Sequence, residues 1–142
     1  MMRTVARDGI SFRFPNRWTM EEEAAETLWT ITLYSSKTAW LIVSLRTDAE
    51  EPTIVADQTL AAFQSEYKEL DYQPALQSIA GLPAIGHDID FFSLDTPIAC
   101  STRVIATPAG PLLFLAQADE DEWPEFEKQI HAIFASLQIE QE

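Results

Sequence analysis

Residues 9–18 constrain the fold more than any other part of the chain, because they read as a β-strand with a fixed end. They run Gly-Ile-Ser-Phe-Arg-Phe-Pro-Asn-Arg-Trp, so Phe12 and Phe14 point to one side of a sheet and Arg13 to the other. Pro15 cannot donate the next hydrogen bond of the ladder, and the strand must therefore end there. This pattern indicates an architecture and carries no reaction chemistry.

The length of 142 residues is that of a single domain, and we expect one domain over residues 1–142. Folding at this size removes roughly 68–70% of the surface of the unfolded chain, so the core needs no disulfide or metal. Hydrophobic residues make up 46% of the sequence and aromatic residues 11%, which gives the apolar area that a disordered chain lacks. The chain is therefore expected to be folded throughout.

The charge of the chain restricts its partners. It has 23 acidic and 9 basic residues, for a formal net charge of -14. Such a charge repels nucleic-acid phosphates and anionic membrane surfaces and favours basic partners, although it also serves solubility alone. We therefore expect no nucleic-acid and no membrane partner, and a basic or amphipathic protein segment as the partner if one exists. The sequence lacks a secretion signal and a run of about 18 apolar residues, which predicts a cytoplasmic protein.

The first half of the chain predicts a hairpin followed by a helix. Residues 28–34 and 40–46 alternate apolar and polar side chains, and the short link between them favours an antiparallel pair. In residues 52–70 apolar side chains recur at spacings of three and four, as on one face of an amphipathic helix. Thr53 is the expected cap of this helix.

The second half predicts further strands and a closing helix. Extended stretches separated by turn-forming clusters cover residues 72–80, 84–94 and 98–107. Residues 111–117 are apolar without alternation, which is typical of a central strand covered on both faces. Residues 123–137 repeat apolar side chains at helical spacing, and acids at the amino end complement the helix dipole.

These elements and three short motifs resemble the Mog/PsbP-like superfamily. Residues 9–18 are similar to that group's opening strand with Phe-Pro and Trp, and residues 81–84, Gly-Leu-Pro-Ala, to its entry into a hairpin. Residues 126–139 are similar to its terminal helix and short final strand. The resemblance implies an α+β fold, in which a mostly antiparallel sheet of about six to seven strands is sandwiched by helices in three α/β/α layers.

Members of that superfamily assist photosystem II, bind a nuclear-import GTPase or chaperone exported bacterial effectors, and none is ordinarily described as an enzyme. Because these roles share one scaffold, the resemblance implies a fold and not a role. No functional residue of the family maps by motif onto this chain.

His87 is one of two histidines and lies in an expected strand. Strand geometry places it beside Ile85 and Ile89, while Asp88 and Asp90 point to the other face. These carboxylates therefore cannot share a metal site with it. A hydrogen-bonded histidine within the sheet is the expected role.

The other candidates also fall short of a catalytic or metal site. Cys100 is the only cysteine and lies in an expected strand, where it should behave as a small buried hydrophobe. His131 lies one helical turn after Glu127, which favours a surface ion pair, and two ligands do not make a zinc site. The four glycines are isolated, so no phosphate loop is present. We interpret residues 21–23 and 119–122 as solvated charges at element ends, and we predict no enzyme, no metal and no cofactor.

A partner-binding surface is the remaining hypothesis. Trp40 points away from the apolar face of its strand, so without a covering helix it would form part of an exposed apolar patch. Glu120, Asp121, Glu122 and Glu125 would supply acidic residues to that surface. We therefore predict a non-catalytic cytoplasmic protein-interaction module, an accessory factor or chaperone. The alternative is a small-ligand or lipid carrier with a pocket between sheet and helix.

Overall fold

The computed structural model of the chain describes residues 1–48 and 51–141. Within this part of the chain the elements are, in order, β1 (Met2–Arg7), β2 (Ile10–Pro15), β3 (Thr19–Ala24), β4 (Leu28–Tyr34), β5 (Trp40–Arg46), α1 (Pro52–Glu66), β6 (Leu70–Ile79), β7 (Leu82–Ser93), β8 (Thr96–Thr107), β9 (Gly110–Asp119), α2 (Trp123–Ser136) and β10 (Gln138–Ile139). None of the described helices is long and apolar enough to cross a membrane.

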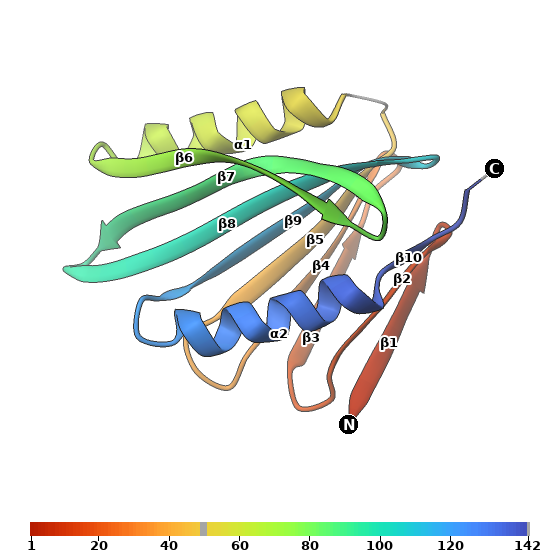
Figure 1. Cartoon of the computed structure of the whole chain (residues 1–142), viewed down its shortest axis with the longest axis horizontal. Coiled ribbons are helices and arrows are strands. Elements are labelled where there is room, and N and C mark those ends of the chain that lie inside the picture. Colours follow the sequence, from red (N-terminus) through yellow and green to blue (C-terminus); the bar gives the residue numbers. More distant parts are fainter. Residues whose placement is uncertain (49–50, 142) are drawn as a thin grey trace.

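Seven strands form one antiparallel sheet in the order β3-β4-β5-β9-β8-β7-β6. A second, three-stranded sheet has the order β1-β2-β10. Figure 1 shows α1 along one face of the large sheet, and α2 together with the small sheet on its other side. The expected antiparallel sheet between helices is therefore confirmed, and the small sheet shares the layer of α2.

The alternation of β5 shows how the sheet divides the core. Leu41, Val43 and Leu45 are fully buried in the cluster that includes the apolar face of α2. Trp40 and Ile42 point the other way and pack in the cluster beneath α1. One strand therefore supplies both cores, as its period of two requires.

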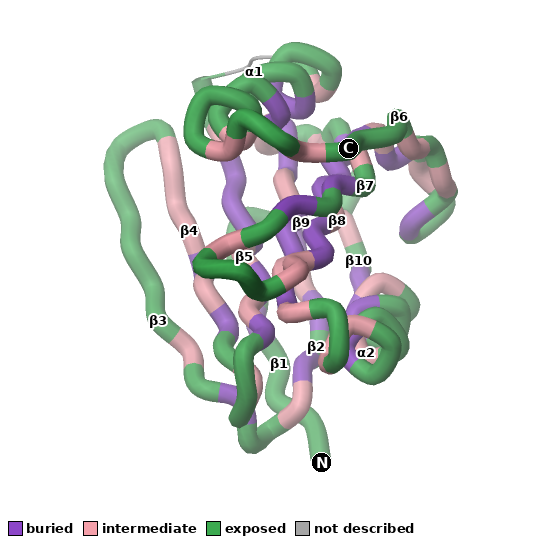
Figure 2. Tube along the Cα trace, turned by 90° about the vertical axis from the view of Figure 1, so that its left-hand side faces the viewer, coloured by how far each residue is buried: buried purple, intermediate pink, exposed green. Residues whose placement is uncertain are grey.

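β9 is a central strand of the large sheet, between β5 and β8. Leu112 and Phe114 are buried on the side of α2, whereas Leu113 and Leu115 pack toward α1. Because both faces are covered, the strand is apolar without alternation, as the sequence predicts. In Figure 2 the buried residues follow the central strands, while the edge strands β3 and β6 are largely exposed.

The acidic residues 21–23 lie inside β3. The prediction that they lie at the end of an element is therefore wrong. β3 is an edge strand exposed along nearly its whole length, and an exposed edge needs no apolar alternation. Arg7 of β1 forms an ion pair with Glu22 of this strand at 2.6 Å. The three acids therefore mark a charged, protected edge of the large sheet.

The first helix differs from expectation at both ends. Its N-cap is Glu51, not Thr53, and Pro52 occupies the first turn, where no backbone N–H is required. The helix ends at Glu66, so Leu70 belongs to the next strand. The apolar spacing continued past the helix because Leu70 packs into the same core from β6.

Three of the hairpin turns have left-handed backbone at both loop residues, and the first of them, Asp8 and Gly9 with φ of 50° and 78°, joins β1 to β2. Ala80 and Gly81, with φ of 54° and 76°, join β6 to β7, and Ile79 pairs with Leu82 across them. The loop residues 94–95, at φ of 50° and 65°, join β7 to β8. Two-residue loops with this backbone are type I′ turns, whose twist matches that of the strands they connect.

Candidate functional site

An acidic hollow lies at one end of the large sheet, where β6 and β8 begin and β7 and β9 end. Its volume is about 330 Å³. It is lined by Glu69, Leu70, Asp71, Asp90, Phe91, Phe92, Pro97, Ile98 and Glu120. Four of these lining residues are carboxylic acids, and none of them is basic. We call this site the acidic hollow.

The pairing of β6 with β7 brings carboxylates of the acidic hollow together. Asp71 and Asp90 are directly opposed across the two strands. Asp88 lies two residues before Asp90 and therefore on the same face. Partial burial raises the pKa of Asp90 above its ordinary value, and the charges of Asp71 and Asp88 raise it further. A cationic group placed in the hollow would reduce this repulsion.

Two exposed apolar side chains flank the acidic hollow. Phe92 is 68% exposed and lines it, and Leu94 is 98% exposed in the turn that follows β7. The φ of 50° at Leu94 lies in the left-handed region, which costs a residue with a Cβ about 1–2 kcal/mol. Neither side chain adds to the core, so both are free to contact another molecule.

Trp40 does not form an exposed apolar patch, because a helix covers its face of the sheet. Its side chain packs against the cluster that contains Leu60 of α1, with Phe63 and Tyr67 beside it. Because α1 covers this face, Trp40 is half-buried and contributes to the core. The apolar surface next to the acids comes instead from the turn after β7.

The predicted acidic residues divide into two groups. Glu122 accepts hydrogen bonds from the Thr38 amide at 2.7 Å, the Thr38 hydroxyl at 2.6 Å and the Ser35 hydroxyl at 2.9 Å. Partial burial acts to raise the pKa of Glu122, but these hydrogen bonds outweigh it and lower the pKa below its ordinary value. Glu122 therefore holds the β4–β5 turn against the start of α2.

The remaining acids of the prediction face solvent. Glu120 lines the acidic hollow, and Asp121 and Glu125 are exposed next to it along the chain. Glu125 lies in the first turn of α2, where a carboxylate also complements the helix dipole. The structure thus brings Glu120 into a site together with acids of β6 and β7 that sequence reasoning left out.

A signal for the missed carboxylates exists in the sequence. Asp71 precedes Ala80 by as many residues as Asp90 follows Gly81, so a two-residue turn at 80–81 makes them cross-strand partners. The turn expected from the sequence lies at residues 81–83, and a turn of that length does not pair Asp71 with Asp90. A turn of two residues, at 80–81, would have predicted that these two carboxylates face each other.

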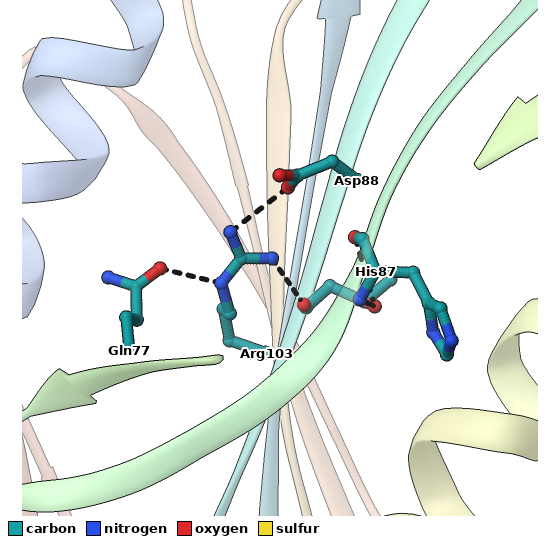
Figure 3. A network of polar contacts seen from close by, with 5 residues as sticks. Gln77, His87, Asp88 and Arg103 are labelled. Carbon is teal, nitrogen blue, oxygen red and sulfur yellow. Dashed lines mark hydrogen bonds and ion pairs between the residues drawn. The ribbon is translucent and has the colours of Figure 1, made fainter. Parts of the chain in front are cut away.

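A polar network lies on the α2 side of β7 and β8 and serves the fold (Figure 3). Arg103 is 9% exposed, and its guanidinium donates to Gln77 at 2.6 Å, to the Thr102 carbonyl at 2.8 Å and to Asp88 at 3.0 Å. Three partners from three strands compensate for the burial of the charge. Since the guanidinium is held this way, we assign it a structural role.

A local distortion of the β7–β8 ladder accompanies this network. The hydroxyl of Thr102 accepts a hydrogen bond from the His87 amide at 3.0 Å, while the Thr102 carbonyl accepts one from the Arg103 guanidinium. A Cβ at Gly86 would lie 1.8 Å from that carbonyl oxygen. Glycine is therefore the residue that this close approach of two backbones requires.

His87 lies on the face that strand geometry predicts, toward α1. Its ring meets Tyr72 edge-on, with centroids 5.9 Å apart. Nδ1 is buried, and the described residues offer it no hydrogen-bond partner. The expectation of a hydrogen-bonded ring is therefore wrong for this atom.

Cys100 is 2% exposed, as predicted for a small hydrophobe in a strand. Burial raises the pKa of its thiol to about 12, with further contributions from the charges of Asp88 and Asp90. A thiolate is the reactive form of cysteine, so this side chain is inert at neutral pH.

The expected ion pair between Glu127 and His131 does not form. In residues 1–48 and 51–141 the ion pairs are Arg7–Glu22 and Arg103–Asp88. The described residues also contain no group of three or more His, Cys, Asp and Glu side chains that could hold a metal ion.

A second concave site, which we call the α1 groove, lies between the start of α1 and the sheet. Its volume is about 480 Å³, and its lining is mainly apolar. The lining residues are Glu51, Pro52, Thr53, Leu82, Pro83, Ile85, Val104 and Ala106. The groove is at the opposite end of the sheet from the acidic hollow, because it contains the start of β7 and the end of β8.

Neither the protein-family models nor the curated proteins compared with the chain match it. Solved structures do. A putative regulator of unknown function from Pseudomonas aeruginosa, PA94, has a TM-score of 0.60 at 14% identity, over 99% of both chains. LpqN, involved in cell envelope biogenesis of Mycobacterium tuberculosis, has a TM-score of 0.62 at 17% identity, over 98% of this chain and 90% of its own.

Cyanobacterial PsbP from Synechocystis also matches, with a TM-score of 0.57 at 13% identity, over 98% of this chain and 92% of its own. Likeness at this identity concerns the fold alone. The chain has the α+β fold of PsbP-like proteins, with two helices, a seven-stranded antiparallel sheet and a small three-stranded sheet in its described part.

Proposed function

We propose that this chain is a non-catalytic protein-interaction module of the Mog/PsbP-like superfamily, an accessory factor or chaperone-like protein of the cytoplasm. Its partner is a basic or amphipathic segment of another protein, which binds at the acidic hollow. The observation that supports this most is the gathering of four carboxylates, with no basic residue in the lining, beside the exposed Phe92 and Leu94. The likeness to a putative regulator agrees with a role without catalysis.

The acidic hollow favours a partner of positive charge. A lysine or arginine near Asp71 and Asp90 relieves their mutual repulsion, and each partly exposed contact contributes about 0.2–1 kcal/mol. Covering Phe92 and Leu94 adds about 1.5–3 kcal/mol for each side chain that becomes fully buried. Because the charge contribution is screened, the binding should weaken with salt.

A labelled cationic amphipathic peptide tests the proposal by fluorescence anisotropy. We expect binding at about 0.1 M salt that weakens strongly near 1 M, where the screening length falls from ~10 to ~3 Å. The double substitution Phe92→Ser with Leu94→Ser should weaken binding at least about a hundredfold, since it removes the burial of two apolar side chains. Ile54→Ser is the matched control, since Ile54 is 44% exposed but lies by the α1 groove. Absence of binding at low salt, or an equal loss with Ile54→Ser, would count against the proposal.

The α1 groove supports a second candidate function, that of a small-ligand or lipid carrier. A volume of about 480 Å³ with a mainly apolar lining falls within the range of ligand sites. A ligand that binds only the folded chain raises its melting temperature by mass action. Thermal-shift screening with fatty acids and apolar metabolites separates the two functions, and Ile85→Asp should abolish any shift that arises in this groove.

A further inference from the structure

We propose that the partner segment binds as an additional β-strand on the open edge of β6, and that it alternates basic with apolar residues. This inference rests on the proposed function and specifies how the acidic hollow is used. The new strand runs beside β6 where that strand enters the hollow.

The edge of β6 is open. β6 is the last strand of the large sheet, and within the described part of the chain it pairs with β7 alone. α1 packs mainly on β7, β8 and β9, and the start of β6, at Leu70, joins the core beneath this helix. Most residues of β6 are exposed, Tyr72 by 48% and Leu76 by 74%.

The turn at residues 80–81 fixes which backbone groups of β6 face outward. In a type I′ hairpin the flanking pair, Ile79 and Leu82, exchanges hydrogen bonds. Hydrogen-bonded and non-hydrogen-bonded pairs alternate along an antiparallel ladder. The residues of β6 that turn their N–H and C=O groups away from β7 are therefore Leu70, Tyr72, Pro74, Leu76 and Ser78.

Pro74 is consistent with this assignment and limits it. Proline lacks the N–H, so it is tolerated at an outward position of an edge strand, where no bond to β7 is lost. It also interrupts the outward row of donors. Strand addition is thereby confined to a short stretch, and Leu70 and Tyr72 are the outward residues nearest the acidic hollow.

The two faces of β6 select the side chains of the added strand. Asp71 shares its face with Asp90, while Asp88 on that face is already paired with Arg103. Residues of the partner that meet Asp71 and Asp90 should therefore be basic. Leu70 and Tyr72 lie on the opposite face, where apolar residues of the partner should pack. Because side chains alternate between the two faces of β6, the partner strand must alternate basic and apolar residues.

Neither the other edge of the large sheet nor a second copy of the chain fits this role. β3 carries the acids of residues 21–23 and is exposed except at Met20, which packs against the core, so it offers little apolar surface to receive a strand. A second copy would bring two chains of net charge -14 together, and their like charges disfavour it. A basic strand from another protein is the occupant that charge complementarity favours.

Two peptides of identical composition test the mode of binding. One alternates lysine and valine, and the other arranges the same residues at helical spacing. We expect the alternating peptide to bind at least tenfold more tightly. Equal affinities would overturn the strand model and leave the proposed function standing, whereas absence of binding by both would overturn both.

N-methylation tests the backbone contacts. Two versions of the alternating peptide are methylated on alternate amides, one set each, so that only one version loses the donors that face β6. We expect the affinities of the two versions to differ at least tenfold. Equal affinities, whether both retained or both lost, would overturn the model.

Substitutions on β6 complete the test. Tyr72→Pro removes the side chain and an outward N–H, whereas Tyr72→Ser removes the side chain alone. We expect Tyr72→Pro to bind the alternating peptide about tenfold more weakly than Tyr72→Ser, with circular dichroism confirming the fold of both. Asp71→Lys should also weaken binding, while Glu23→Lys makes the same change of charge on β3 and should have little effect. Equal effects within either pair of variants would contradict the model.

Discussion

Replacing Asp90 by asparagine should stabilise the protein at neutral pH. The folded chain holds this carboxylate opposite Asp71 and beside Asp88, and its pKa is raised by partial burial and by these charges. Folding therefore favours the protonated form, and its contribution to stability is lost as the pH rises from the unfolded pKa through the folded pKa. At neutral pH the ionised group is destabilising, and the neutral amide removes this effect.

The size of the effect is modest because Asp90 is exposed to solvent. Opposed like charges on a sheet, and partly exposed charge pairs in general, are worth about 0.2–1 kcal/mol. For a chain of this length such a change corresponds to a rise in melting temperature of roughly 1–4 °C. Salt near 1 M should reduce the gain, since it screens the repulsion.

Thermal unfolding followed by circular dichroism measures this prediction. Asp90→Asn is compared with the wild-type chain at pH 7 and at acid pH, where the wild-type carboxylate is already protonated. Asp57→Asn is the control, because it removes the same charge from an exposed position on α1. A gain that persists unchanged at acid pH, or an equal gain from Asp57→Asn, would refute the electrostatic reasoning.

Three further predictions concern the structure around the site. Gly86→Ala should lower the free energy of unfolding by about 3 kcal/mol or more, because the added Cβ would lie 1.8 Å from the Thr102 carbonyl oxygen. Chemical denaturation measures this loss, and a change below about 1 kcal/mol would contradict the close approach of the two backbones. Glu122→Gln should lower the free energy of unfolding by about 1 kcal/mol at neutral pH. The folded state lowers the pKa of Glu122, so the stability contributed by this carboxylate is lost as the pH falls through the folded pKa, and the variant should match the wild type at acid pH. A loss that does not depend on pH would argue against the charged hydrogen bonds. Cys100, with a pKa of about 12, should resist alkylation in the folded chain and react after unfolding, and rapid labelling of the native protein would contradict its burial.

The layers of the fold could be predicted from the sequence because apolar periodicity reports burial directly. The unalternating run of β9 indicated a strand covered on both faces, and the helical spacing after Trp123 indicated α2. β1 and β3 escaped prediction, since each has at most one buried residue and so no apolar pattern to read. An exposed edge strand is held by its partner's hydrogen bonds, and these leave little trace in composition.

The candidate site was predicted in character but not in position. An acidic surface beside an apolar patch was expected around Trp40, but the path of α1 across the sheet buries that side chain. The acidic hollow depends on the opposition of Asp71 and Asp90, which follows from the length of one turn. A one-residue change in register moves every side chain to the other face, so the site could not be located before that turn was fixed.

Nuclear magnetic resonance titration tests the central claim most directly. Amide shifts of the labelled chain are followed as the alternating lysine and valine peptide is added. The account predicts that the largest shifts cluster at residues 69–72, 90–98 and 120, and that they vanish at high salt. Shifts centred on residues 51–53 and 82–85, around the α1 groove, would contradict it.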